Sequence, residues 1–91
     1  MPLDADEIRE RAPEGWALAE HALRKEFAFK GFTAAVAFVQ RLVEPANEAR
    51  HHPDLEIHYN RVVVSLTTHD AGGVTDEDLA LAAIIETLVE P

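Results

Sequence analysis

Residues 55–67 read LEIHYNRVVVSLT, two runs with alternating side chains that meet at Asn60. Side chains two positions apart point to the same face of a β-strand, so each run predicts a strand with one apolar face. The strands are expected at Leu55–Tyr59 and Arg61–Thr67. Because the link at Asn60 is so short, they predict an antiparallel hairpin.

A second hairpin is predicted nearer the N-terminus. The segments Trp16–Ala19 and Ala22–Phe29 are rich in apolar and aromatic side chains and predict its two strands. Glu20 and His21 between them are expected at the turn. We interpret Trp16 as a core side chain, since large aromatic residues mostly contribute burial.

Helices are predicted before, between and after the hairpins. Asp4 with Glu7, and Thr75 with Asp78, have the spacing of a helix-starting capping box. The first helix is expected to end near Pro13. The buried side of the last helix is expected to comprise Leu79, Ala82, Ala83, Ile85, Leu88 and Val89.

The helix between the hairpins is the longest, opening at Gly31 or Thr33. Apolar residues recur along it at helical spacing and predict one buried stripe. That stripe comprises Phe32, Ala35, Val36, Val39, Leu42, Val43 and Ala46. Pro45 removes one backbone donor inside this helix, and a kink is expected there.

These elements follow one another in the order α-β-β-α-β-β-α. Two hairpins and three amphipathic helices predict an α+β fold, in which helices pack on one face of an antiparallel four-stranded sheet. With 91 residues the chain predicts a single domain over 1–91. A domain of this size gains stability from oligomerisation.

The composition narrows the function classes. Eight basic and seventeen acidic residues give a net charge of −9, which argues against nucleic acid and anionic membranes as direct partners. The chain has no cysteine, which excludes disulfides and thiol chemistry. The first residues are acidic and form no apolar run, so neither a signal peptide nor a membrane span is predicted and the cytoplasm is the expected location.

Three of the five histidines gather in two short segments. His51 and His52 precede Pro53, and His69 follows seventeen residues after His52. Pro53 disfavours the helical conformation for His52, so the long helix is expected to stop at Arg50 or His51. Histidines at such a break are placed to face a cleft, where imidazole accepts and donates protons near neutral pH.

The chain resembles the pterin-4a-carbinolamine dehydratase family. The match is carried by His51-His52-Pro53, then Tyr59, His69 and Asp78 at gaps of five, nine and eight residues. The resemblance extends to Gly15-Trp16, to FAFKGF at 27–32 and to TTHDAGG at 67–73, and so covers nearly the whole chain.

The resemblance implies dehydration of 4a-hydroxytetrahydrobiopterin to quinonoid dihydropterin, which recycles the pterin cofactor of aromatic amino acid hydroxylases. It implies that His51, His52 and His69 are catalytic, with His52 as main acid or base. Substrate binding is assigned to His51, His52, Pro53, His69 and Asp78. Neither a metal nor a redox cofactor is expected, because no electrons move. Homodimers or homotetramers are typical of the family.

One position departs from the family pattern. Four residues before His51 the family prefers a charged side chain, whereas this chain has Asn47, followed by Glu48. Helical spacing places both beside His51. His21 and His58 lack support from the motif and are interpreted as a turn residue and a strand-surface residue.

Two other functions stay open at this stage. A non-catalytic dimerisation or assembly scaffold of the same fold has no need of three imidazoles in one cleft. A metal-dependent hydrolase is disfavoured, because adjacent side chains such as those of His51 and His52 diverge in direction.

Overall fold

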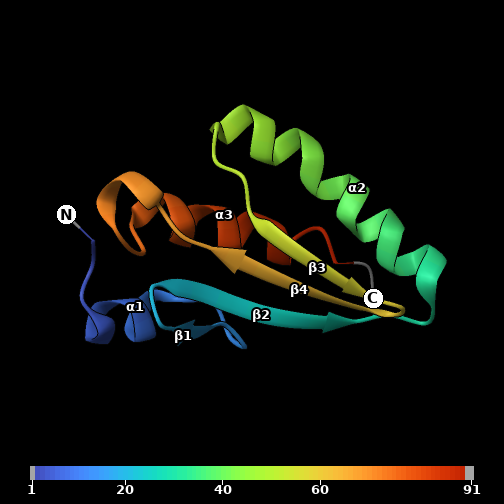
Figure 1. Ribbon diagram of the computed structural model, residues 1–91, viewed down its shortest axis with the longest axis horizontal. Helices are drawn as coiled ribbons and strands as arrows, with labels where there is room; N and C mark the ends of the chain where they lie inside the picture. The colour runs from blue at the N-terminus through green and yellow to red at the C-terminus, as the bar shows by residue number, and fades with distance from the viewer. Residues whose placement is uncertain (1, 90–91) are drawn as a thin grey trace.

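The computed structural model describes residues 2–89 (Figure 1). Its helices and strands follow the order α-β-β-α-β-β-α. They are α1 (Ala5–Arg11), β1 (Ala17–Ala19), β2 (Ala22–Ala28), α2 (Phe32–Ala49), β3 (Asp54–His58), β4 (Arg61–Leu66) and α3 (Asp76–Glu86), with a 3-10 helix η1 (His69–Ala71) before α3. The predicted order and the α+β class are confirmed, with most limits one residue from those predicted.

The sheet has the strand order β1-β2-β4-β3, and all neighbouring strands are antiparallel. Both predicted hairpins are present, with two-residue turns at Glu20-His21 and Tyr59-Asn60. Glu20 and Tyr59 have φ angles of 57° and 55°, the left-handed conformation that such tight turns require. The two hairpins join where β2 pairs with β4 at the centre of the sheet.

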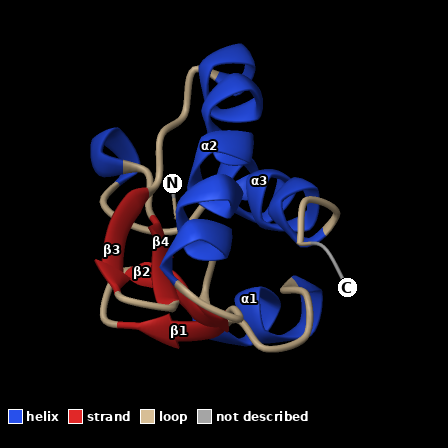
Figure 2. Ribbon diagram, turned by 90° about the vertical axis from the view of Figure 1, so that its right-hand side faces the viewer, coloured by secondary structure: helices blue, strands red, loops and turns tan. Residues whose placement is uncertain are grey.

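The three α-helices lie on one side of the sheet (Figure 2). The core between the layers is built mainly from Leu23, Phe27, Val62, Val64 and Leu66 of the sheet, Ala35, Phe38 and Leu42 of α2, and Leu79, Leu81, Ala82 and Ile85 of α3. We call the other side of β2 and β4 the open face; it carries Ala22, Arg24, Glu26, Arg61, Val63 and Ser65. Within residues 2–89 no helix is both long and apolar enough to span a membrane.

The buried stripes of the helices differ from those predicted. In α2 Phe38 is completely buried, whereas Phe32 and Val43 are each 54% exposed. Only a narrow strip of α2 faces the core, and Phe38 lies in its middle, at helical spacing from Ala35 and Leu42. In α3 Leu81 is buried and Ala83 is exposed, since α3 packs against α2 as well as the core.

The edge strand β3 is exposed along its whole length. Leu55 and Ile57 pair with the buried Val64 and Val62, so they lie on the side of the sheet that the helices cover. They nevertheless remain 37% and 42% exposed. The helices therefore do not reach far enough to cover β3.

Polar contacts tie the N-terminal segment to α3. Trp16 is buried, as predicted, and its Nε1 donates to Glu86 at 2.9 Å. Glu86 also accepts from Lys25 Nζ at 2.7 Å. At the other end of α3, Arg11 binds Asp76 at 2.6 Å, and this hydrogen bond is the main cause that raises the pKa of Arg11.

Candidate active site

The His-His-Pro segment follows a helix end that reverses the chain. α2 continues through Pro45 and ends at Ala49. Arg50 then adopts the left-handed conformation, with φ 53° and ψ 39°. The amide of His51 donates to the carbonyl of Ala46 at 3.1 Å, a bond typical of such helix ends. The reversal takes His51 off the helix and brings its side chain to α3.

Asp78 in the first turn of α3 receives this side chain. Nε2 of His51 is hydrogen-bonded to Oδ1 of Asp78, which is completely buried. Oδ2 of Asp78 accepts from the Thr68 hydroxyl at 2.8 Å and from the Thr75 amide at 2.9 Å. Thr75 also caps α3, so the predicted capping box is confirmed. Because every oxygen of the carboxylate has a partner, its burial is tolerated.

His51 is largely enclosed by these contacts. Only 11% of its side chain is exposed. Its other ring nitrogen, Nδ1, lies 3.6 Å from the carboxylate of Glu77, which is exposed. The imidazole is thus held between two side chains of the α3 N-terminus, where the helix dipole also favours carboxylates.

His52 lies in different surroundings. It is exposed, and its Nε2 is 2.8 Å from Oδ1 of Asn47. Helical spacing had placed Asn47 beside His51, and this prediction is wrong. The helical register ends at Arg50, so the next residues do not continue the spacing that brings i and i+4 together.

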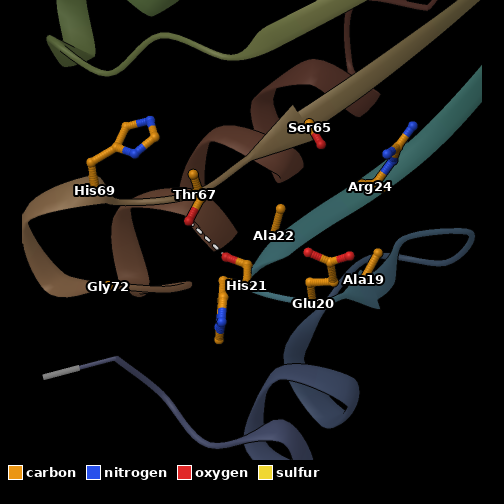
Figure 3. Close-up of a pocket in the computed structure, with 9 residues that line it drawn as sticks. All are labelled: Ala19, Glu20, His21, Ala22, Arg24, Ser65, Thr67, His69 and Gly72. Carbon is orange, nitrogen blue, oxygen red and sulfur yellow. Dashed lines mark hydrogen bonds between the residues drawn. The ribbon is translucent and has the colours of Figure 1, made fainter.

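His69 lies at the start of η1 and is exposed. It borders a pocket of about 440 Å³ on the open face. The pocket is lined by the β1–β2 turn (residues 19–22), Arg24, Ser65, Thr67, His69 and Gly72. Figure 3 shows His69 at one end of this group and Arg24 at the other, with Ser65, Thr67 and Ala22 between them.

The structure brings the two histidine segments together at one carboxylate. Asp78 binds His51 directly and Thr68, the neighbour of His69, through its other oxygen. Within residues 2–89 no hydrogen bond links two of the three imidazoles. His51 and His52 are not among the residues that line the pocket beside His69. Asp78, predicted as a substrate-binding residue, is wholly buried, and its carboxylate contacts His51, Thr68 and Thr75.

The remaining histidines have the structural positions predicted for them. His21 lies in the β1–β2 turn, where its carbonyl accepts from the Thr67 hydroxyl at 2.7 Å. His58 is exposed on β3, 3.2 Å from Glu56. Among the described residues no group of three or more His, Cys, Asp or Glu side chains is arranged to hold a metal ion.

The sequence as a whole matches the model of the pterin 4 alpha carbinolamine dehydratase family over residues 1–88. The chain belongs to this family. A relative from Thermosynechococcus vestitus, provisionally named pterin-4-alpha-carbinolamine dehydratase, is 53% identical over 81% of this chain and 78% of its own. A relative from Sulfolobus acidocaldarius with the same provisional name is 46% identical over 97% of this chain and 99% of its own.

Solved structures share the fold. The crystal structure of a transcriptional coactivator/pterin dehydratase from Brucella melitensis superposes with a TM-score of 0.92 at 32% identity, covering 99% of this chain and 100% of that one. A pterin dehydratase-like protein, described as a RuBisCO assembly factor in the alpha-carboxysome, has a TM-score of 0.65 at 23% identity, over 80% of this chain and 84% of its own. The second likeness shows the fold alone.

Several residues around the site were not found from the sequence. The TTHDAGG motif contains Thr68 beside His69 but does not indicate that the Thr68 hydroxyl binds Asp78. Arg24 and Ser65 lie far apart in the chain and meet only because β2 and β4 pair them directly. Periodicity within single strands does not reveal such a pairing.

Proposed function

We propose that this chain dehydrates 4a-hydroxytetrahydrobiopterin by histidine general acid/base catalysis. The C4a–O bond breaks as the departing hydroxyl takes a proton. N5 loses its proton, and the C4a–N5 double bond of quinonoid dihydropterin forms. The electrons of the N5–H bond stay in the product, so the reaction needs no redox partner. A positioned acid or base contributes about 10²–10⁴-fold to such a step.

The proposal divides the work among the three histidines. His52 is exposed and its Nε2 lies beside Asn47, so its imidazole is accessible to a substrate and is the main acid or base. His69 borders the pocket and handles the second proton. His51, fixed by Asp78, orients the substrate and shares in proton transfer. In this proposal His51, His52, Pro53 and His69 contact the pterin, while Asp78 acts through His51.

The observation that carries the proposal is the double use of Asp78. A single buried carboxylate holds both the His-His-Pro segment and the Thr-His segment. In the sequence these two segments of the family motif lie apart, since the sixteen residues 53–68 separate His52 from His69 and include the whole β3–β4 hairpin. Burial of a carboxylate is costly unless its oxygens are fully paired, so a buried carboxylate that holds His51 in one position supports a use for that imidazole.

We further propose that the protein works as a homodimer or homotetramer in the cytoplasm. The exposed Leu55 and Ile57 of β3 give the edge strand an apolar side that a second copy can cover. Phe32 and Val43 give α2 an exposed apolar surface that a second copy can also cover. A separate two-electron reduction of the quinonoid product then regenerates the tetrahydropterin cofactor of aromatic amino acid hydroxylases.

The same exposed apolar surface favours one alternative, a scaffold that assembles other proteins without catalysis. Turnover separates the two functions. A 4a-hydroxypterin generated in situ is mixed with the purified protein, and its decay is followed by absorbance against the uncatalysed rate. Acceleration proportional to protein concentration supports the dehydratase. An unchanged decay rate would refute it and leave the scaffold.

A further inference from the structure

The pocket on the open face has a floor of small side chains. Ala19, Ala22, Ser65 and Thr67 lie on neighbouring strands or at their ends, and none projects far from the sheet. Its volume of about 440 Å³ is within the range of small-molecule pockets. A flat bicyclic ring fits on a floor of this kind. His69 at one end then lies beside the ring, and a second set of polar groups lies at the other end (Figure 3).

Glu20 is one of those polar groups. It occupies the first position of the β1–β2 turn, with a φ of 57° that is unfavourable for any residue with a side chain. It is exposed, and no hydrogen bond or ion pair of its carboxylate is found among residues 2–89. The turn itself is fixed, because the Thr67 hydroxyl donates to the carbonyl of His21. Glu20 is thus an available acceptor on an anchored turn.

Arg24 is the other polar group. It pairs with Ser65 in the ladder between β2 and β4 and points to the open face. Its Nη2 lies 3.4 Å from Glu56 on β3, a long contact between exposed side chains. That contact uses one of five guanidinium donors, so the others can serve a ligand. Figure 3 draws Arg24 and Glu20 toward the same end of the pocket, so Arg24 offers donors at the end where Glu20 offers an acceptor.

This pair matches one edge of a pterin. The pyrimidine ring presents two adjacent donors, N3–H and the 2-amino group, followed by the acceptor O4. A carboxylate accepts two parallel bonds from such donors, and a guanidinium donates to the neighbouring oxygen. We infer that the open-face pocket binds the pyrimidine edge of the substrate, with Glu20 on N3–H and the 2-amino group and Arg24 on O4. The inference rests on the proposed function, since it takes a pterin as the substrate. Held this way, the pyrazine half of the ring extends from the Glu20 and Arg24 side across the floor of the pocket.

The test uses three unreactive probes on the intact protein: 6-methyl-7,8-dihydropterin, its 2-oxo counterpart 6-methyl-7,8-dihydrolumazine, and 7,8-dihydrobiopterin. Dissociation constants are measured by fluorescence titration. The parent protein is expected to bind the dihydropterin about tenfold more tightly than the dihydrolumazine, since only the former has the 2-amino donor. Glu20→Gln should largely abolish this preference. Arg24→Met should weaken the binding of the dihydropterin and of the dihydrolumazine about tenfold, since both carry O4.

Matched controls lie on the same face outside the pocket. Glu26 and Arg61 face each other at 3.8 Å, one on β2 and one on β4. Glu26→Gln and Arg61→Met should leave all three dissociation constants within about twofold of the parent. An unchanged preference in Glu20→Gln would overturn the inference. A loss of affinity confined to 7,8-dihydrobiopterin would also overturn it, because Glu20 and Arg24 would then bind the hydroxylated substituent instead.

Carbinolamine turnover, measured on the same proteins, separates this inference from the proposed function. A parent that dehydrates the carbinolamine while Glu20→Gln keeps the full preference refutes the inference alone. A parent that binds dihydropterin with the Glu20-dependent preference but does not accelerate dehydration supports the inference and refutes the proposed function.

Discussion

His51 and Asp78 form a hydrogen-bonded pair that links the end of α2 to the first turn of α3, and the carboxylate of the pair is wholly buried. The pair sets one histidine apart from the other two. His52 and His69 are exposed, whereas His51 has most of its surface covered. An imidazole held in this way keeps one orientation, as preorganised sites require.

Asp78→Ala should destabilise the fold and also reduce activity. The change leaves His51, the Thr68 hydroxyl and the Thr75 amide without their shared partner, which predicts a loss of about 3 kcal/mol in the free energy of unfolding. Urea denaturation measures this loss. Asp70→Ala is the control, since Asp70 is exposed in η1, and it should stay within about 0.5 kcal/mol of the parent. Equal stability of the two variants would contradict the structural role of Asp78.

Thr68→Val should show whether the hydrogen bond from Thr68 positions Asp78, because the variant keeps the carboxylate itself. The substitution removes one donor to Oδ2 and keeps the side-chain shape, which predicts a loss of about 1 kcal/mol in stability. If Asp78 positions His51, kcat for the carbinolamine should also fall while KM changes little. Rescue of kcat by Thr68→Ser, which restores the hydroxyl, would confirm that the hydrogen bond is responsible. A Thr68→Val protein with parental kcat would show that Asp78 does not need this donor.

Asn47→Glu should alter the behaviour of His52 and not that of His51. A carboxylate at this position would favour the protonated form of the imidazole whose Nε2 lies beside residue 47. The pH–rate profile of kcat/KM should therefore shift toward higher pH. Glu48→Gln is the control and should leave the profile in place, since Glu48 is exposed and no contact with His52 is seen in the described part of the chain. A profile that Asn47→Glu does not move would separate His52 from the rate-controlling proton transfer.

His52→Ala should lower turnover by about 10²-fold or more while leaving stability within about 0.5 kcal/mol. His69→Ala should also lower turnover, and the double variant should lose less than the product of the two single losses, because groups that act together are not additive. His58→Ala is the control, since His58 is exposed on β3 and far along the strand from the site. Parental turnover in His52→Ala with lost turnover in His58→Ala would place the site elsewhere.

The sequence predicted the fold through features that act within one element. Alternation identified the β3–β4 hairpin, and the spacing of Thr75 and Asp78 identified the start of α3. Pro53 correctly indicated that α2 stops near Arg50. These signals are local, because each depends on backbone geometry over a few residues.

The candidate site was less accessible to such reasoning. The contact of Asn47 with His52 depends on the left-handed conformation of Arg50. An arginine in the sequence does not predict this conformation. The burial of Asp78 depends on how α3 packs against the end of α2. The pairing of Arg24 with Ser65 depends on the register between two distant strands. All three are tertiary relationships that helical or strand periodicity leaves undetermined.

Phe38 tests the corrected core. It is completely buried and contacts the rings of Phe27 and Phe29, each with a centroid separation of 5.0 Å, although the predicted stripe of α2 omitted it. Phe38→Ala should cost about 3–5 kcal/mol in the free energy of unfolding, and Phe38→Leu, which leaves a smaller cavity, should cost less. Phe32→Ala is the control on the same helix. Phe32 is 54% exposed, so its loss should cost well under half as much. Chemical denaturation of the three variants at equal protein concentration gives the comparison. A larger loss for Phe32→Ala than for Phe38→Ala would mean that the predicted stripe, and not Phe38, forms the contact of α2 with the core.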